Sequence, residues 1–189
     1  MLKYNSSIKL GVFIMISKMK ISEFDKVFEI MDKSFPNSEM RDYDGQKKLL
    51  SADKDIYSIY VERNDNNDVI GFIAFWELTD FTYIEHFAVD EKCRGKNIGE
   101  KMLNEFVKAQ SRPVVLEVEY PEDDFSIRRI GFYKRNNFIM NEYKYLQPPT
   151  RVGNDFLPLK IMSSPRAITE QEFLTLNNDL YTKVYKYKK

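Results

Sequence analysis

In the first half of the chain, hydrophobic residues follow helical spacing and then strand spacing. The segment 24–31 predicts a helix with Ser22 as its cap, and a shorter helix is expected at 46–51. Three runs of strand character follow, at 56–61, 69–78 and 81–89. The polar cluster 64–68 indicates a hairpin between the first two runs, so we expect three successive antiparallel strands.

In the second half, helical and strand patterns alternate. Helical spacing is found at 98–108 and 124–135, and strand patterns at 114–119, 138–146 and 157–162. A meander followed by this alternation predicts an α/β (α+β) fold, in which a mixed, mostly antiparallel central sheet of about six to seven strands is flanked by helices. We expect the strand at 157–162 to lie at a sheet edge, where it could form a homodimer.

We expect one central domain, with a short segment before it and a helix after it. The apolar run 10–16 is too short to cross a membrane, which takes about 20 residues, and no cleavage site typical of a signal peptide follows it. We therefore interpret it as a first strand and expect no membrane contact. The predicted division is an extension or first strand at 1–14, a domain at 15–165 and a packed helix at 166–189. The stripe of that last helix consists of Phe173, Leu176, Leu180 and Val184.

Composition narrows the class of protein further. The chain has 189 residues with 29 basic and 29 acidic side chains, and 14% of its residues are aromatic. This length fits one domain with a full core, and a balanced charge argues against a nucleic-acid binder. One cysteine and one histidine leave no Cys/His zinc cluster, so no metal is expected. The scarcity of cysteine is compatible with the reducing cytoplasm, which is the predicted location.

The segment 89–100 carries the clearest chemical signal, because it joins a strand to a helix through a polar loop. The start of a helix presents unpaired N–H groups and the positive end of the helix dipole, so it can hold an anion. Gly95 and Gly99 allow close approach to the backbone, while Arg94 and Lys96 add positive charge. The loop therefore predicts a pyrophosphate site, although a tight turn with a solvated basic rim would have the same pattern.

Two common nucleotide signatures do not fit this loop. A Walker loop requires Gly-Lys-Ser/Thr at its end, but Glu100 follows Gly99 here. The glycine pattern of the Rossmann fold is absent, and the strands before the loop are predicted to be antiparallel rather than parallel.

The loop resembles the acyl-coenzyme A loop of the GNAT N-acetyltransferase superfamily, whose pattern is [QR]-x-x-G-x-[GA]. Arg94, Asn97 and Gly99 fill these positions, with Asn in place of the first glycine. Asn tolerates left-handed backbone better than other residues with a side chain, so binding is expected to survive. The segment 84–89 is similar to the family's fourth strand and 131–138 to its late helix, with Asn137 again at a glycine position.

The resemblance implies that acetyl-coenzyme A is the co-substrate and that a primary amine of a small molecule or peptide attacks it directly, through a tetrahedral intermediate. The pantetheine arm would run beside the fourth strand, and the pyrophosphate would lie on the loop. The residues implied in cofactor binding are Phe87, Ala88, Val89, Arg94, Gly95, Lys96, Asn97, Ile98 and Gly99.

Two residues are predicted to carry the proton transfers. The resemblance implies that Tyr133 is the general acid, because the family's late-helix tyrosine lies near the thiol. Glu85 is the predicted general base, since it is the one carboxylate on a strand face shared with Tyr83 and Phe87. A regular strand would place His86 on the opposite face.

Other carboxylates and the substrate loop leave alternatives open. Glu117 and Glu119 share a face of the next strand, and either could be the base instead of Glu85. The loop 38–44 is charged; its acids could attract an amine, while Arg41 could bind a substrate carboxylate. Cys93 is expected to serve packing.

Two functions from other classes compete with catalysis. A non-catalytic, regulatory acyl-coenzyme A-binding module is one, because Asn replaces glycine at two positions of the family pattern. A nucleotide-binding domain that prefers ATP or NAD is the other.

Overall fold

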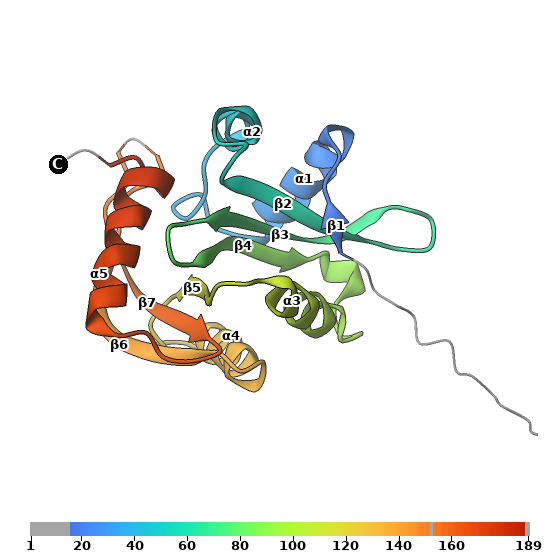
Figure 1. Ribbon diagram of the computed structural model, residues 1–189. Helices are drawn as coiled ribbons and strands as arrows, with labels where there is room; N and C mark the ends of the chain where they lie inside the picture. The colour runs from blue at the N-terminus through green and yellow to red at the C-terminus, as the bar shows by residue number, and fades with distance from the viewer. Residues whose placement is uncertain (1–15, 152, 188–189) are drawn as a thin grey trace, which may run out of the picture.

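The computed structural model describes residues 16–151 and 153–187, and its centre is a seven-stranded sheet (Figure 1). The strands are β1 (Ser17–Lys18), β2 (Tyr57–Arg63), β3 (Val69–Glu77), β4 (Thr82–Val89), β5 (Val114–Val118), β6 (Ile139–Gln147) and β7 (Leu157–Ser164). They lie in the order β1-β2-β3-β4-β5-β7-β6. All neighbours are antiparallel except β4 and β5, which are parallel. The expected mixed, mostly antiparallel sheet is confirmed.

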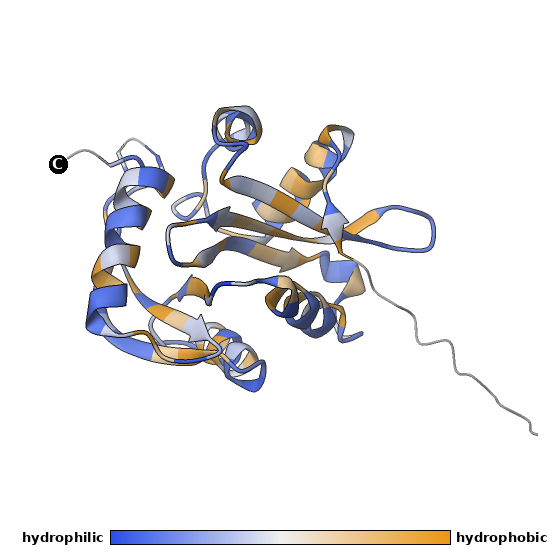
Figure 2. Ribbon diagram, in the orientation of Figure 1, coloured by the Kyte–Doolittle hydropathy of each residue, from blue (hydrophilic) through white to orange (hydrophobic). Residues whose placement is uncertain are grey.

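Helices cover both faces of the sheet. They are α1 (Phe24–Ser34), α2 (Tyr43–Ala52), α3 (Ile98–Ala109), α4 (Asp124–Arg135) and α5 (Glu170–Asp179). Figure 1 shows α1 and α2 on one side of the sheet and α3 and α4 on the other, and α5 packs with the α1 side. In Figure 2, α1 and α3 each carry hydrophobic and hydrophilic stretches, as expected of helices that cover a sheet.

Two hydrophobic cores result, one on each face of the sheet. Alternating residues of β3 show the division: Ala74 and Trp76 belong to the core under α1, α2 and α5, whereas Ile73 and Phe75 belong to the core under α3 and α4. The second core includes Phe106 of α3, whose ring centroid lies 4.8 Å from that of Phe75.

A β-bulge in β4 changes which face Glu85 occupies. Ala74 pairs with His86 and Phe75 pairs with Ile84, so Glu85 is the extra residue between them. Glu85 and His86 consequently lie on the same face, with Glu85 Oε2 3.7 Å from His86 Nδ1. The expectation that His86 faces away from Glu85 is wrong, and so is the shared face of Glu85 and Phe87. Both expectations assumed a regular strand.

The predicted position of the last strand is also wrong. β7 lies between β5 and β6, so β6 is an edge of the sheet and β7 has no free edge for a homodimer. The sequence shows the order of strands along the chain, whereas their order in the sheet depends on how the β6–β7 hairpin folds back against β5. The homodimer itself stays untested.

Near the N-terminus, the helix cap differs from the expectation. Ser22 lies inside a 3-10 turn (Ile21–Glu23), and the Glu23 carboxylate accepts a hydrogen bond from the Lys20 N–H at 2.7 Å. Most of the strand expected at 10–16 lies outside the described residues. The division into segments 1–14, 15–165 and 166–189 stays a prediction. Within the described residues, no helix has the length and apolar character needed to cross a membrane.

Candidate active site

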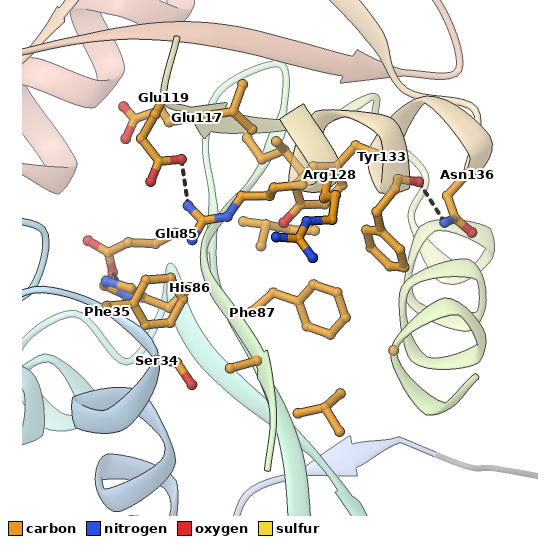
Figure 3. Close-up of a pocket in the computed structure, with 18 of the residues that line it drawn as sticks. Ser34, Phe35, Glu85, His86, Phe87, Glu117, Glu119, Arg128, Tyr133 and Asn136 are labelled. Carbon is orange, nitrogen blue, oxygen red and sulfur yellow. Dashed lines mark hydrogen bonds and ion pairs between the residues drawn. The ribbon is translucent and has the colours of Figure 1, made fainter. Parts of the chain in front are cut away.

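A cavity opens where β4 and β5 separate. The two strands pair only from Thr82 to Ile84 and from Val114 to Leu116, so beyond these residues their facing backbone groups have no strand partner. The cavity there has a volume of about 730 Å³ and extends from the start of α3, past β4 and α4, to the C-terminal end of the described chain. Figure 3 shows Phe87 on one side of β4, and Glu85 and His86 on the other.

One end of the cavity is the loop that leads into α3. Asp90 caps a 3-10 turn (Glu91–Cys93), and Gly95 has a φ of 79°. Asn97, the residue before α3, has a φ of 57°. This left-handed backbone explains why Asn can stand at a glycine position. The first N–H groups of α3 have no partner within the helix and are available to an anion.

Gly99 keeps the start of α3 open toward the cavity. A Cβ atom at this position would lie 3.5 Å from Phe87 and 3.6 Å from Val89, so no clash within the protein forces the residue to be glycine. The absence of a side chain instead leaves room beside free N–H groups, which fits a phosphate group. Every residue predicted to bind the cofactor lines the cavity except Lys96.

Helix α4 contributes more to the cavity than Tyr133, the one residue of this helix predicted to act in the site. Arg128, Phe132, Arg135 and Asn136 line the cavity from one face of this helix. Their spacing of three and four residues was a usable signal, since such residues share a helix face. Asn136 is buried; its amide donates to the Phe132 carbonyl at 2.9 Å and its oxygen accepts from Asn104 at 2.8 Å. Arg128 and Arg135 add positive charge to the cavity that also contains the anion cradle, which is the loop 94–99 at the start of α3.

Glu85 lies at the other end of the cavity and is held as a carboxylate. Arg41 Nη1 lies 2.5 Å from one of its oxygens, and the Trp76 indole N–H donates to the other at 3.0 Å. Burial alone would raise the pKa of Glu85, but the Arg41 charge and these hydrogen bonds outweigh it and lower the pKa. Arg41 also donates to the Val184 carbonyl at 2.9 Å. The expectation that Arg41 binds a substrate carboxylate is therefore wrong, because its guanidinium group already forms an ion pair with Glu85.

Glu117 has a different environment. Its Oε2 accepts hydrogen bonds from the Tyr83 and Tyr185 hydroxyls, each at 2.8 Å, while its Oε1 is buried without a partner in the described structure. Burial raises its pKa to about 7, against the opposing effect of the phenols, and the nearby charge of Glu85 adds to the rise. Glu117 is thus a cavity residue that can exchange a proton near neutral pH.

The other two predicted candidates also line the cavity. Glu119 forms an ion pair with Arg129 at 2.6 Å, which is drawn in Figure 3. Tyr133 is buried in α4, with its ring packed edge-on against Phe138. Burial raises the pKa of the Tyr133 phenol to about 12, so this hydroxyl keeps its proton at neutral pH and can donate it.

His86 and Cys93 also line the cavity. His86 is buried, its Nε2 lies 3.2 Å from the Glu39 carbonyl oxygen, and burial lowers its pKa. Cys93 is partly exposed and lines the cavity. Among the residues that the structure describes, no group of three or more His, Cys, Asp or Glu side chains could hold a metal ion.

The sheet and the anion cradle at α3 fit the acyltransferase fold that the sequence motifs resemble, and comparison with known proteins agrees. Residues 24–138 match the model of the "Acetyltransferase (GNAT) family". A Bacteroides thetaiotaomicron protein assigned to the same family has a TM-score of 0.85 and 31% sequence identity, over 93% of this chain and all of that one (100%). The chain belongs to the GNAT family of acetyltransferases, which use acetyl-coenzyme A as co-substrate.

More distant structures share the fold. Phosphinothricin acetyltransferase from Sinorhizobium meliloti, solved with acetyl-coenzyme A, has a TM-score of 0.57 and 13% identity over 83% of this chain and 94% of that one. Ribosomal-protein-alanine N-acetyltransferase from Brucella melitensis has a TM-score of 0.60 and 14% identity over 80% of this chain and 99% of that one. No curated protein matches the chain.

The left-handed backbone at Asn97 predicts how substitutions affect stability. Asn97→Val should lower the free energy of unfolding by about 1–2 kcal/mol, because a β-branched residue is strained at a φ of 57°. Asn97→Gly, the matched control, should stay within about 0.5 kcal/mol of the wild type. Urea denaturation measures both values. Equal stability of the two variants would contradict the left-handed cap.

The ion pair between Arg41 and Glu85 predicts a pH-dependent effect. Arg41→Met should lower the free energy of unfolding at neutral pH by about 3–5 kcal/mol, because it leaves a buried carboxylate unpaired. The pKa of Glu85 is lowered in the folded protein, so the ion pair stabilises the fold above the ordinary carboxyl pKa of 4.5 and less as the pH falls below it. The difference in the free energy of unfolding between Arg41→Met and the wild type should therefore become smaller as the pH falls.

Denaturation at several pH values tests this expectation, and the double variant Arg41→Met/Glu85→Leu is its control. Removing both charges should restore much of the stability at neutral pH. A deficit that is the same at every pH would show that the ion pair is not its cause.

Proposed function

We propose that this protein transfers the acetyl group of acetyl-coenzyme A to a primary amine of a small molecule or peptide, by direct attack through a tetrahedral intermediate. The observation that carries the proposal is one continuous cavity that joins the anion cradle at Gly99 to the buried carboxylate of Glu117. The cradle fits the pyrophosphate. The edge of β4 at Phe87, Ala88 and Val89 that has no partner in β5 fits the amides of the pantetheine arm.

The charge around the far end of the cavity supports an amine as the acceptor. Its lining there includes Glu39, Glu85, Glu117 and Glu119. Glu85 and Glu119 are neutralised by arginine partners, at 2.5 and 2.6 Å. Glu39 and Glu117 have no ion-pair partner among the described residues, which leaves this end acidic and suited to a cationic amine before it loses its proton.

For the proton of the attacking amine, the geometry favours Glu117 over Glu85. A base has to be ionised and able to accept a proton near the working pH. Glu85 is ionised but already paired with Arg41, whereas Glu117 has no ion-pair partner among the described residues and a pKa of about 7. We assign the base to Glu117 and give Glu85 the role of holding Arg41, while its predicted role as the base stays open to the test below.

Tyr133 is assigned the second proton transfer. Its phenol is protonated at neutral pH, lies in the cavity wall and could donate to the leaving thiolate. A non-catalytic acyl-coenzyme A-binding module is the competing function, and it would not depend on this hydroxyl.

Calorimetric titration tests the donor site. We expect micromolar binding of acetyl-coenzyme A and none of ATP or NAD at the same concentrations. Gly99→Leu should weaken binding by more than about tenfold, because its side chain fills the space beside the free N–H groups. Leu174→Ala, on the exposed face of α5, is the control. Tight binding of ATP, or unchanged binding by Gly99→Leu, would contradict the assigned cradle.

Steady-state kinetics tests the proton transfers, with thiol release measured over a panel of small amines and peptides. Glu117→Gln should lower kcat by about 10²–10⁴-fold and abolish the rise of the rate as the pH passes about 7. Tyr133→Phe should also lower kcat. If Glu85→Gln removed this pH dependence and Glu117→Gln kept it, the base would be Glu85. If Tyr133→Phe bound acetyl-coenzyme A and retained the full rate, Tyr133 would not be the acid.

A further inference from the structure

The C-terminal segment after α5 reaches into the acceptor end of the cavity. α5 continues into a π-helix (Leu180–Val184), and the next residue, Tyr185, lines the cavity together with residues of β4 and β5. This segment lies outside residues 24–138, which match the family model. A π-helix is rare and is often found at functional sites.

Tyr185 and Tyr83 both donate their hydroxyl protons to one oxygen of Glu117. The Tyr185 hydroxyl donates to Glu117 Oε2 at 2.8 Å and lies 3.0 Å from the Tyr83 hydroxyl, which donates to the same oxygen at 2.8 Å. Tyr83 is buried, and Glu117 and Tyr185 are partly buried in the cavity wall. The two phenols therefore occupy one oxygen of Glu117 and leave the other, Oε1, without a partner in the described structure.

Contacts on both sides of Tyr185 fix this segment to the domain. Before it, Arg41 donates to the Val184 carbonyl at 2.9 Å, and Lys183 Nζ lies 2.7 Å from the Thr79 hydroxyl. After it, Lys186 forms an ion pair with Asp53 at 2.7 Å. Because Arg41 also binds Glu85, one buried guanidinium joins the predicted catalytic strand to the C-terminal segment.

We propose that Tyr185 is a positioning residue, which holds the Glu117 carboxylate by its Oε2 in the cavity wall, where this carboxylate receives the proton of the acceptor amine. The C-terminal segment is then part of the active site, although it lies outside the matched region of the family. This inference rests on the proposed function, in which Glu117 is the base.

The hydrogen bonds also determine when Glu117 ionises. Tyr83 and Glu85 face it from β4, Tyr145 faces it from β6 without a hydrogen bond of normal geometry, and Tyr181 and Tyr185 face it from the C-terminal segment. Arg41 and His86 lie behind Glu85. A phenol that donates to a carboxylate favours its ionised form, so removing the Tyr185 hydroxyl should raise the pKa of Glu117.

Tyr185→Phe tests the proposal, because it removes the hydroxyl and keeps the ring. The acid limb of the kcat profile should move up by about one pH unit, the effect expected for one hydrogen bond to a charged group. With a wild-type pKa of about 7, the rate at pH 7 should fall about fivefold and recover at higher pH. A variant that had merely lost its fold would not recover its rate at higher pH. The Kd of Tyr185→Phe for acetyl-coenzyme A should equal that of the wild type.

The chain offers a matched control in the π-helix that precedes Tyr185. Tyr181 donates its hydroxyl to the Leu146 carbonyl at 2.7 Å and makes no hydrogen bond to Glu117, so Tyr181→Phe should leave the pH profile where it is. Tyr83→Phe should move the profile in the same direction as Tyr185→Phe. If Tyr185→Phe instead had the wild-type profile, like Tyr181→Phe, the proposal would be overturned.

A direct titration separates this inference from the proposed function. Carbon-13 NMR can follow the Glu117 carboxyl, assigned by its loss in Glu117→Gln, in protein that is not turning over. A midpoint raised in Tyr185→Phe and unchanged in Tyr181→Phe supports the role of Tyr185, and equal midpoints overturn it. If the wild type transferred no acetyl group to any amine of the panel, the proposed function would fail while this titration still decided whether Tyr185 controls Glu117.

Discussion

The separation of β4 from β5 after three paired residues is the constraint on which the rest of the site depends. Parallel strands normally continue their hydrogen bonds along their length, but here pairing stops at Ile84 and Leu116. The backbone beyond this point can then bind a ligand instead of a strand, and the space between the strands becomes the cavity. The bulge at Glu85 lies directly after the last pair, so Glu85 and His86 turn to one face at the place where the strands part.

Glu85 and Glu117 line the same cavity, but the fold gives them different hydrogen-bond and ion-pair partners. Glu85 has a guanidinium at 2.5 Å, whereas Glu117 has only phenols. An arginine lowers the pKa of a buried acid much more than a phenol can, so burial dominates at Glu117 but not at Glu85. Two acids in one cavity thereby acquire different proton affinities, which is a common way to divide structural and catalytic roles.

Features that depend on a local pattern of residues could be predicted from the sequence. The segment 98–108 and the helix 124–135 followed from hydrophobic spacing, and Asn97 could be expected to adopt a left-handed backbone. The bulge at Glu85 could not be predicted, because it depends on the register of β3 against β4. The partner of Arg41 and the contact between Tyr185 and Glu117 join residues 44 and 68 positions apart, and no local pattern encodes such pairs.

The two ends of the cavity consequently differ in what the family match explains. The cradle at Asn97 and Gly99 lies within residues 24–138, so membership of the family accounts for the donor end. At the acceptor end, Gln147, Leu159 and Tyr185 line the cavity from outside that range. Since an acetyltransferase selects its acceptor through the walls around it, the identity of the amine depends on a part of this chain that the family pattern does not describe.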